Sequence, residues 1–313
     1  MACMQLLFTL FLLGAGLLIP GLGLELTATL ILAFALTFSS TVFVIQVMQD
    51  RGEMSSRHAN LAIGILLIQD LAAVIFLTAT KGTLPQPEAI LLLALWPLRS
   101  LVPRLLARAG HGELFTLFGL GLALGGAALF ELVGIKGDLG ALIIGALLAG
   151  TQKSKELARN LMQFKDLFLV GFFLTIGLNG WPDPAETIIA LILGVLVMIK
   201  PPLYFLLMTK FHTPPRTALL SASAMGNFSE FGLVVIATAA AAGWVDSQWD
   251  NAFSLAIAVS FLFSSPISQR AHQWYRRYHG FWLKFESRRV AASLPDLGGT
   301  RIMVLGMGNI GTG

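Results

Sequence analysis

Residues 59–80 read ANLAIGILLIQDLAAVIFLTAT, an apolar stretch with Gln69 and Asp70 at its centre. About 20 helical residues, rising ~1.5 Å each, cross the hydrocarbon core of a bilayer, so this stretch predicts a spanning helix with Asp70 near the midplane. A carboxyl group at that depth is costly unless it is protonated, paired with a cation or open to a watery cavity. We therefore expect Asp70 to belong to a functional site. The alternative is a structural aspartate that is hydrogen-bonded between helices.

The composition predicts an all-α polytopic membrane protein. Of the 313 residues, 56% are hydrophobic and 12% are charged, whereas soluble domains carry about 25% charged residues. Cys3 is the single cysteine, which excludes an internal disulfide and a cysteine metal cluster. Because no catalytic constellation or metal-ligand spacing is visible, we expect neither an enzyme nor a metal site. The histidines that lack ligand spacing are His58, His111, His212, His272 and His279.

Ten nearly uncharged segments are candidate membrane crossings. They are 4–20, 25–49, 59–80, 88–106, 114–132, 138–152, 165–180, 186–209, 217–242 and 250–269. When all ten cross, 18 of the 21 Lys and Arg residues fall on one side, and positively charged loops stay cytoplasmic. This distribution predicts a multi-pass protein of the cell (inner) membrane with both ends in the cytoplasm. It also explains the net charge of +4 without a nucleic-acid partner.

Two crossings are predicted to be broken in the middle. Ser39, Ser40 and Thr41 interrupt the second crossing, and GNFSEFG (226–232) interrupts the ninth. Irregular backbone at membrane depth occurs where it is buried in protein or lines a watery cavity. Each break lies in the middle helix of a triplet, formed by the first three and by the last three predicted crossings. The two triplets begin on opposite sides of the membrane and therefore have opposite orientations. Such inverted repeats indicate a transporter substrate site, whereas the alternative is that small residues only permit close helix packing.

Two further ionisable residues lie deep in apolar segments, Lys200 and Glu230. Lys200 is ~14 Å from the cytoplasmic end of its helix. Pairing with a carboxylate would reduce the cost of burying both charges, and the alternative is that the lysine side chain extends to the interface. Glu230 is either a second titrating group or a structural acid that binds Lys200 or backbone amides.

The residues after the tenth crossing predict a cytoplasmic region. The segment RAHQWYRRYHGFWLKFESRRV (270–290) resembles an amphipathic helix on the inner leaflet. A short strand at 301–305 precedes Gly306, Gly308 and Gly311, which form the G-x-G-x-x-G turn of dinucleotide sites. We therefore divide the chain into a transmembrane domain (1–269), an amphipathic linker (270–300) and the start of a Rossmann-like nucleotide-binding domain (301–313). No cofactor is expected in this chain, and NAD(H) or another nucleotide is the ligand expected of the complete domain.

Seven features follow one another along the chain: SSTVFVIQVM, AIGILLIQDLAAV, GALIIGALLAG, FKDLFLVGFFLTIGLN, Lys200, GNFSEFGLVV and RIMVLGMGNIG. In order and spacing they resemble the Kef-type potassium-efflux members of the monovalent cation:proton antiporter-2 family. Those members typically have a few more N-terminal helices, form homodimers and end in a nucleotide-binding domain. The resemblance therefore implies that this chain is N-terminally shortened and is cut at the start of that domain.

The resemblance also implies a fold and a site. The fold is the sodium/proton-antiporter-like one, with two crossed broken helices beside a dimerisation or panel domain and elevator-like alternating access. By position, Asp70 is the shared cation and proton site, Gln69 is its neighbour, and Lys200 is the charge partner. Polar groups at the breaks line the implied ion path, namely Ser39, Ser40, Thr41, Asn227, Ser229 and Glu230.

These features predict exchange of a monovalent cation, K⁺ or Na⁺, for a proton at Asp70. Each ion neutralises the carboxylate, so the site crosses the membrane loaded but not empty, and the exchange is electroneutral. One alternative is a gated, channel-like cation pathway, which needs no titrating acid. Another is an intramembrane enzyme that uses Asp70 with Glu230, which would leave Lys200 and the inverted breaks without a role.

Overall fold

The protein is described by a computed structural model, which covers residues 25–80, 112–135, 137–149 and 183–287, with single residues and short runs within 3–14, 92–110 and 153–174. All regular structure in these residues is helical, as predicted. The helices are α2 (Leu26–Thr37), α3 (Thr41–Asp50), α4 (Arg57–Thr80), α7 (Glu113–Leu132), α8 (Gly137–Leu148), α10 (Pro184–Leu196), the 3₁₀-helix η2 (Val197–Ile199), α11 (Lys200–Lys210), α12 (Pro215–Ala224), α13 (Glu230–Ala241), α14 (Gln248–Arg277) and α15 (His279–Leu283).

Five described stretches are long and apolar enough to cross a membrane. They are Leu26–Asp50, Arg57–Leu77, Glu113–Leu132, Pro184–Lys210 and Gln248–Arg277. Shorter apolar helices lie at Leu139–Leu148 and Glu230–Ala241. The predicted crossings 4–20, 88–106 and 165–180 fall largely outside the described residues, so the count of ten stays a prediction.

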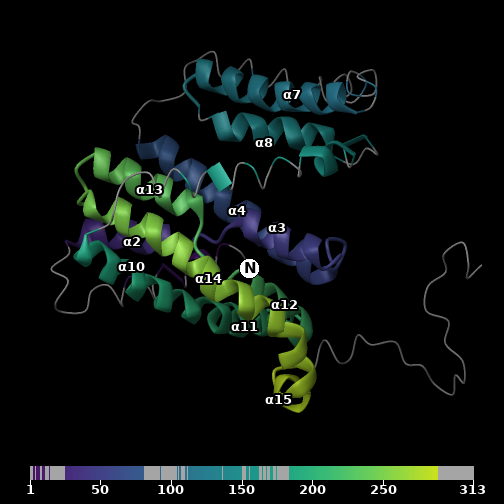
Figure 1. Ribbon diagram of the computed structural model, residues 1–313, viewed down its shortest axis with the longest axis vertical. Helices are drawn as coiled ribbons and strands as arrows, with labels where there is room; N and C mark the ends of the chain where they lie inside the picture. Colours follow the sequence, from purple (N-terminus) through teal and green to yellow (C-terminus); the bar gives the residue numbers. More distant parts are fainter. Residues whose placement is uncertain are drawn as a thin grey trace, which may run out of the picture.

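The helices form a main bundle and a pair that contacts it through α8 and α4. In Figure 1, α7 and α8 lie together at the top of the view, and the other labelled helices lie below them. The two helices of the pair approach closely at glycine, because a Cβ atom on Gly140 would lie 2.2 Å from the carbonyl oxygen of Gly126. Large apolar side chains such as Leu117, Leu124 and Leu132 remain exposed on α7, as expected of a helix that faces acyl chains.

The main bundle contains the described helices of both triplets. α13 packs against α2 and α4, and α14 packs against α10, α12 and α13. Their shared apolar core includes Leu36, Phe38, Phe228, Val235 and Phe253. This packing fixes the interior side of each helix, on which the polar residues at the breaks lie.

The last long helix runs past the predicted domain boundary. α14 continues without interruption from Gln248 to Arg277, although Pro266 lies inside it. The predicted division between residues 269 and 270 therefore falls within a continuous helix. The aromatic and basic residues 270–277, which follow the predicted division, form the last two turns of α14. The short helix α15 then packs against α14.

Candidate ion-binding site

The first predicted break is present between α2 and α3. α2 ends at Thr37, and Phe38 and Ser40 have extended backbone before α3 begins at Thr41. Ser40 is the N-cap of α3, because its hydroxyl accepts a hydrogen bond from the amide of Phe43 at 3.2 Å. The consecutive hydroxyls thus mark the break because serine stabilises the start of a new helix.

The second break is built in the same way between α12 and α13. α12 ends at Ala224, and Ser229 caps α13 by accepting from the amide of Phe231 at 3.2 Å. The break comprises residues 225–229 and is shorter than the predicted 226–232 at its C-terminal end, because Glu230 is already the first residue of α13.

The two breaks contact each other directly. The hydroxyl of Ser39 donates to the carbonyl of Met225 at 2.7 Å, and the amide of Ser40 donates to Oδ1 of Asn227 at 2.7 Å. The same Asn227 side chain donates through Nδ2 to the carbonyl of Ala224 at 3.0 Å. One asparagine therefore ties the start of α3 to the end of α12 and satisfies groups that both interrupted helices leave unpaired.

Lys200 lies next to the contact between the two breaks, which we call the crossing of the breaks, and its side chain is 1% exposed. Its Nζ donates to three carbonyls, those of Leu36 at 3.2 Å, Phe38 at 2.8 Å and Asn227 at 2.7 Å. Three acceptors match the three N–H donors of an ammonium group, and the C-terminal end of α2 favours a positive charge. Among the described residues no carboxylate forms an ion pair with Lys200, so backbone carbonyls take the place of the carboxylate partner expected from the sequence.

The backbone change at Lys200 was not predicted from the sequence. The turn η2 separates α10 from α11, and Pro201 and Pro202 occupy the first positions of α11. This irregular turn, which the Lys-Pro-Pro motif could have indicated, directs the lysine at the crossing.

Residues of α11 and α14 complete the hydrogen bonding of the breaks. The Tyr204 hydroxyl donates to the carbonyl of Thr37 at 3.2 Å. The Ser260 hydroxyl accepts from the amide of Phe228 at 3.1 Å, and Ser264 donates to the carbonyl of Gly226. These residues were not predicted, but the i, i+4 spacing of two serines in an apolar helix is a signal that could have identified them.

Asp70 and Gln69 enter the site from the middle of α4. Oε1 of Gln69 accepts from the amide of Ser39 at 3.0 Å, and Oδ2 of Asp70 accepts from the hydroxyl of Thr41 at 2.9 Å. Two atoms of this pair, Oδ1 of Asp70 and Nε2 of Gln69, are buried without a hydrogen-bond partner in the described part of the chain.

The arrangement of helix ends gives the site its electrostatic character. Thr41 and Glu230 are the first residues of α3 and α13, and the N-terminal end of a helix favours negative charge. Asp70 is hydrogen-bonded to the first of these, and it lies close enough to Glu230 for their charges to interact. The site thus offers a carboxylate oxygen to a cation or a proton, while the lysine is held by backbone carbonyls of the breaks.

The predicted residues fall into three groups. Ser39, Ser40, Thr41, Asn227, Lys200, Gln69 and Asp70 are joined by the hydrogen bonds above. Ser229 and Glu230 lie at the start of α13, where their side chains approach to 3.4 Å. Gly306, Gly308 and Gly311 lie outside the described residues.

A polytopic helical protein with a half-buried carboxylate at two crossed helix breaks has the architecture of an ion transporter. The family model described as the transmembrane sodium/hydrogen exchanger matches residues 1–269. The chain therefore belongs to the sodium/hydrogen exchanger family, which is a family of transporters rather than enzymes. Together with the apolar helices, this membership identifies a multi-pass membrane protein.

Individual relatives carry the name predicted by resemblance. The glutathione-regulated potassium-efflux system protein KefC of Cronobacter sakazakii is 30% identical over 273 residues, which is 79% of this chain and 44% of that protein. KefC proteins of Shigella sonnei and Escherichia coli O139:H28 are each 30% identical over 268 residues, covering 79% of this chain and 43% of theirs. The Kef-type resemblance is confirmed, and the chain spans less than half the length of these relatives.

Proposed function

We propose that this chain is the membrane part of a monovalent cation:proton antiporter that works by alternating access, with Asp70 as the shared site. Family membership supports the exchange of a cation for a proton. The name of the similar KefC proteins, a potassium-efflux system, supports K⁺ as the cargo. We further propose that the protein forms a homodimer. We also propose that it lies in the cell (inner) membrane with its Lys- and Arg-rich side facing the cytoplasm.

The single observation that carries this proposal is the unsatisfied oxygen of Asp70. Oδ1 is buried without a partner in the described residues, while Oδ2 is held by Thr41. Among the described residues Lys200 forms no ion pair with this carboxylate, and its three donors are engaged by carbonyls. A mobile ion must therefore compensate the charge, and either a proton or a monovalent cation at Oδ1 would do so.

Competition at one carboxylate gives obligatory exchange. Either ion makes the site neutral, so the loaded site can pass between the two faces, whereas the empty site would carry an uncompensated charge through a medium of low dielectric. The breaks supply the access, because irregular backbone at this depth can line a watery path. Ser229 and Glu230, at the start of α13, are proposed to lie along that path.

Proton movement in proteoliposomes tests the proposed exchange. The chain is reconstituted with a pH-sensitive dye inside the vesicles, and K⁺, Na⁺ or Li⁺ is added outside. Electroneutral antiport predicts that the inward cation gradient drives protons out and raises the pH of the lumen, and that clamping the membrane potential at zero leaves the rate unchanged. A channel-like pathway would instead give cation flux that follows the membrane potential without obligatory proton movement, and that result would contradict the proposal.

A further inference from the structure

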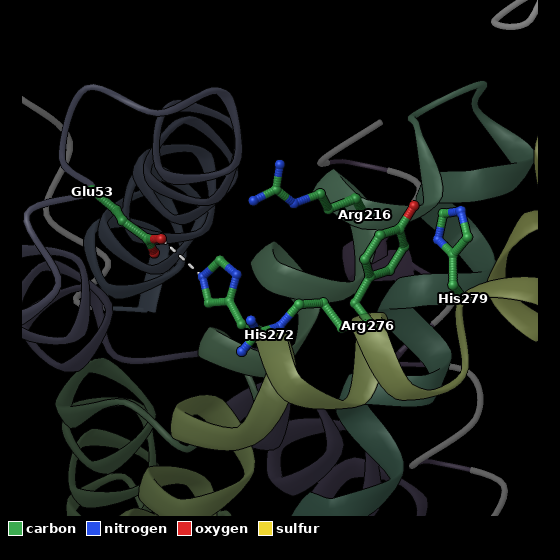
Figure 2. A pocket seen from close by; sticks show the side chains of 6 residues that line it. Glu53, Arg216, His272, Arg276 and His279 are labelled. Atoms are coloured by element: carbon green, nitrogen blue, oxygen red, sulfur yellow. Dashed lines mark ion pairs between the residues drawn. The ribbon is translucent and has the colours of Figure 1, made fainter.

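A second polar cluster lies at the end of the bundle away from the ion site. It consists of Glu53 in the loop between α3 and α4, His58 in the first turn of α4 and His272 near the end of α14. Oε2 of Glu53 is 3.1 Å from Nε2 of His58, and Oε1 is 2.8 Å from Nε2 of His272. Figure 2 shows Glu53 and His272 pointing toward each other from their two elements.

Hydrogen bonding accounts for only part of this cluster, the contact between His58 and Glu53. Nε2 of His272 is buried and makes no well-formed hydrogen bond in the described residues, although Oε1 of Glu53 lies 2.8 Å away. A buried nitrogen in this state is costly. A metal ion bound to both the nitrogen and the oxygen, once the two side chains have moved slightly apart, would satisfy both atoms.

We propose that Glu53, His58 and His272 form a binding site for a divalent transition metal of the zinc class. One ligand atom from each residue lies within 4.8 Å of the other two. Small side-chain movements would place all three atoms ~2.0–2.2 Å from a shared zinc ion. Two imidazoles and one carboxylate are a ligand set that suits Zn²⁺ or Co²⁺. Mg²⁺ and Ca²⁺ prefer oxygen ligands throughout and would bind poorly.

The fourth coordination position is open to a pocket. Glu53 and His272 line a cavity of about 780 Å³, together with Arg216, Tyr275, Arg276 and His279. Figure 2 shows the two arginines and His279 around the same space. Water or a small anion from this pocket can complete a tetrahedral site, as at zinc centres with three protein ligands.

The surrounding positive charges oppose the binding of any cation, so only a metal that binds imidazole strongly would overcome them. Glu53 interacts electrostatically with Arg51, a neighbouring positive charge. Arg51 and Arg216 act electrostatically on His272 and would repel any added cation. A metal that gains little from imidazole would therefore not bind.

Metal binding would join segments that are distant in sequence. Glu53 and His58 flank the start of α4, and His272 lies in the part of α14 that leads to α15. A shared metal would fix the end of α14 against the first triplet and would stabilise the folded chain by mass action. This proposal does not depend on the transport function, because a metal can bind here whether or not Asp70 carries ions.

Direct metal binding to the purified chain in detergent tests the site. The protein carries no polyhistidine tag, and Co²⁺ is used as a spectroscopic probe because four-coordinate Co²⁺ absorbs visible light strongly. We expect about one Co²⁺ per chain with this absorption, displacement by Zn²⁺ and no effect of Mg²⁺. At a metal concentration about 100 times Kd, Tm should rise by about 5 °C.

Variants assign the ligands. We expect Glu53→Gln, His58→Gln and His272→Gln each to weaken binding more than about 100-fold, since even outer-shell partners are typically worth 10- to 100-fold. His279→Gln is the matched control, because His279 lines the pocket but is not in the cluster, and it should bind as the wild type does. The wild-type spectrum decides the matter even where a variant fails to fold. Absence of four-coordinate Co²⁺ absorption, or equal binding by His272→Gln, would overturn the proposal.

Discussion

Individual side chains in this protein form hydrogen bonds with backbone groups that the two helix breaks leave unpaired. Interrupting a helix leaves carbonyl and amide groups unpaired, and at membrane depth water does not reach them unless a cavity is present. Lys200 satisfies three of these carbonyls, while Asn227 and Gln69 satisfy amides of the first break. The identity of each of these residues is therefore set by the geometry of the crossing.

Removing the lysine is expected to destabilise the fold. In Lys200→Met, the carbonyls of Leu36, Phe38 and Asn227 lose their donor, and each unsatisfied buried group costs about 1–3 kcal/mol. We expect a total loss of about 3 kcal/mol or more, seen as a fall in the thermal unfolding midpoint in detergent. Lys210→Met, at the exposed end of α11, is the control and should change stability by less than about 0.5 kcal/mol. Equal midpoints for the two variants would show that the three hydrogen bonds do not support the crossing.

Thr41 provides a prediction about ion binding. Its hydroxyl donates to Oδ2 of Asp70 at 2.9 Å, and a hydrogen bond to a charged group is worth about 1.5–3 kcal/mol. Thr41→Val should raise the cation concentration for half-maximal exchange about tenfold or more, because 1.4 kcal/mol corresponds to a factor of ten. Thr238→Val removes a hydroxyl that bonds within its own helix and should leave the value unchanged. A normal half-maximal concentration in Thr41→Val would mean that this hydroxyl does not orient the carboxylate.

At the scale of elements, close approach of helices holds the broken segments together. A Cβ atom on Gly232 in α13 would lie 2.6 Å from the carbonyl oxygen of Ala35 in α2. Such a contact can be relieved only by separating the two helices, because the obstructing atom belongs to the backbone. The hydrogen bonds between the two breaks depend on this separation.

Gly232→Ala is therefore expected to impair both stability and exchange. Overpacking in a well-packed interior costs about 1–3 kcal/mol, and we expect exchange in proteoliposomes to fall at least tenfold. Gly64→Ala is the matched control in α4, where nothing lies within 4 Å of the added methyl group, and it should behave as the wild type does. Exchange by Gly232→Ala at the wild-type rate would show that α2 and α13 can move apart without loss of function, which contradicts this expectation.

The sequence predicted the elements better than their contacts. The spanning helices and both breaks follow from apolar length, consecutive hydroxyls and glycine, which act locally. The pairing of Ser40 with Asn227 joins residues 187 positions apart, and no local pattern encodes it. For the same reason, the sequence did not predict that carbonyls rather than a carboxylate bind Lys200, or that Glu53 lies beside His272.

The extent of α14 was also beyond local patterns. Polar and basic residues after 269 suggested that the membrane segment ends there, whereas a helix can leave the membrane without a break. The residues of 270–277 are helical because α14 simply continues. Hydropathy therefore predicts where a helix meets the interface and does not predict where the helix ends.

At the scale of the whole molecule, the two ends of the bundle differ in charge. The loop with Glu53, the start of α12 with Arg216 and the end of α14 with His272 meet at one end. α14 begins about 45 Å away from its last residue, at ~1.5 Å for each of 30 residues, beside the contact between Asn251 and Glu186. The distribution of Lys and Arg predicts that the first end is cytoplasmic.

Cysteine labelling tests this orientation. In a Cys3→Ser background, Ser55→Cys and Ser247→Cys place one exposed thiol at each end. A membrane-impermeant maleimide added to intact cells should label Ser247→Cys and should label Ser55→Cys only after the membrane is opened. The reverse pattern would place the basic end outside and would contradict the predicted topology.

The most direct test of the account is ion exchange by Asp70→Asn in proteoliposomes. The asparagine keeps the size of the side chain and removes the charge that a proton or a cation must compensate, so we predict loss of cation-driven proton movement, at least about 100-fold. Asp246→Asn, on the loop before α14, should exchange at the wild-type rate, and both variants should unfold at similar temperatures. Exchange by Asp70→Asn at the wild-type rate would contradict the assignment of the shared site to this carboxyl group.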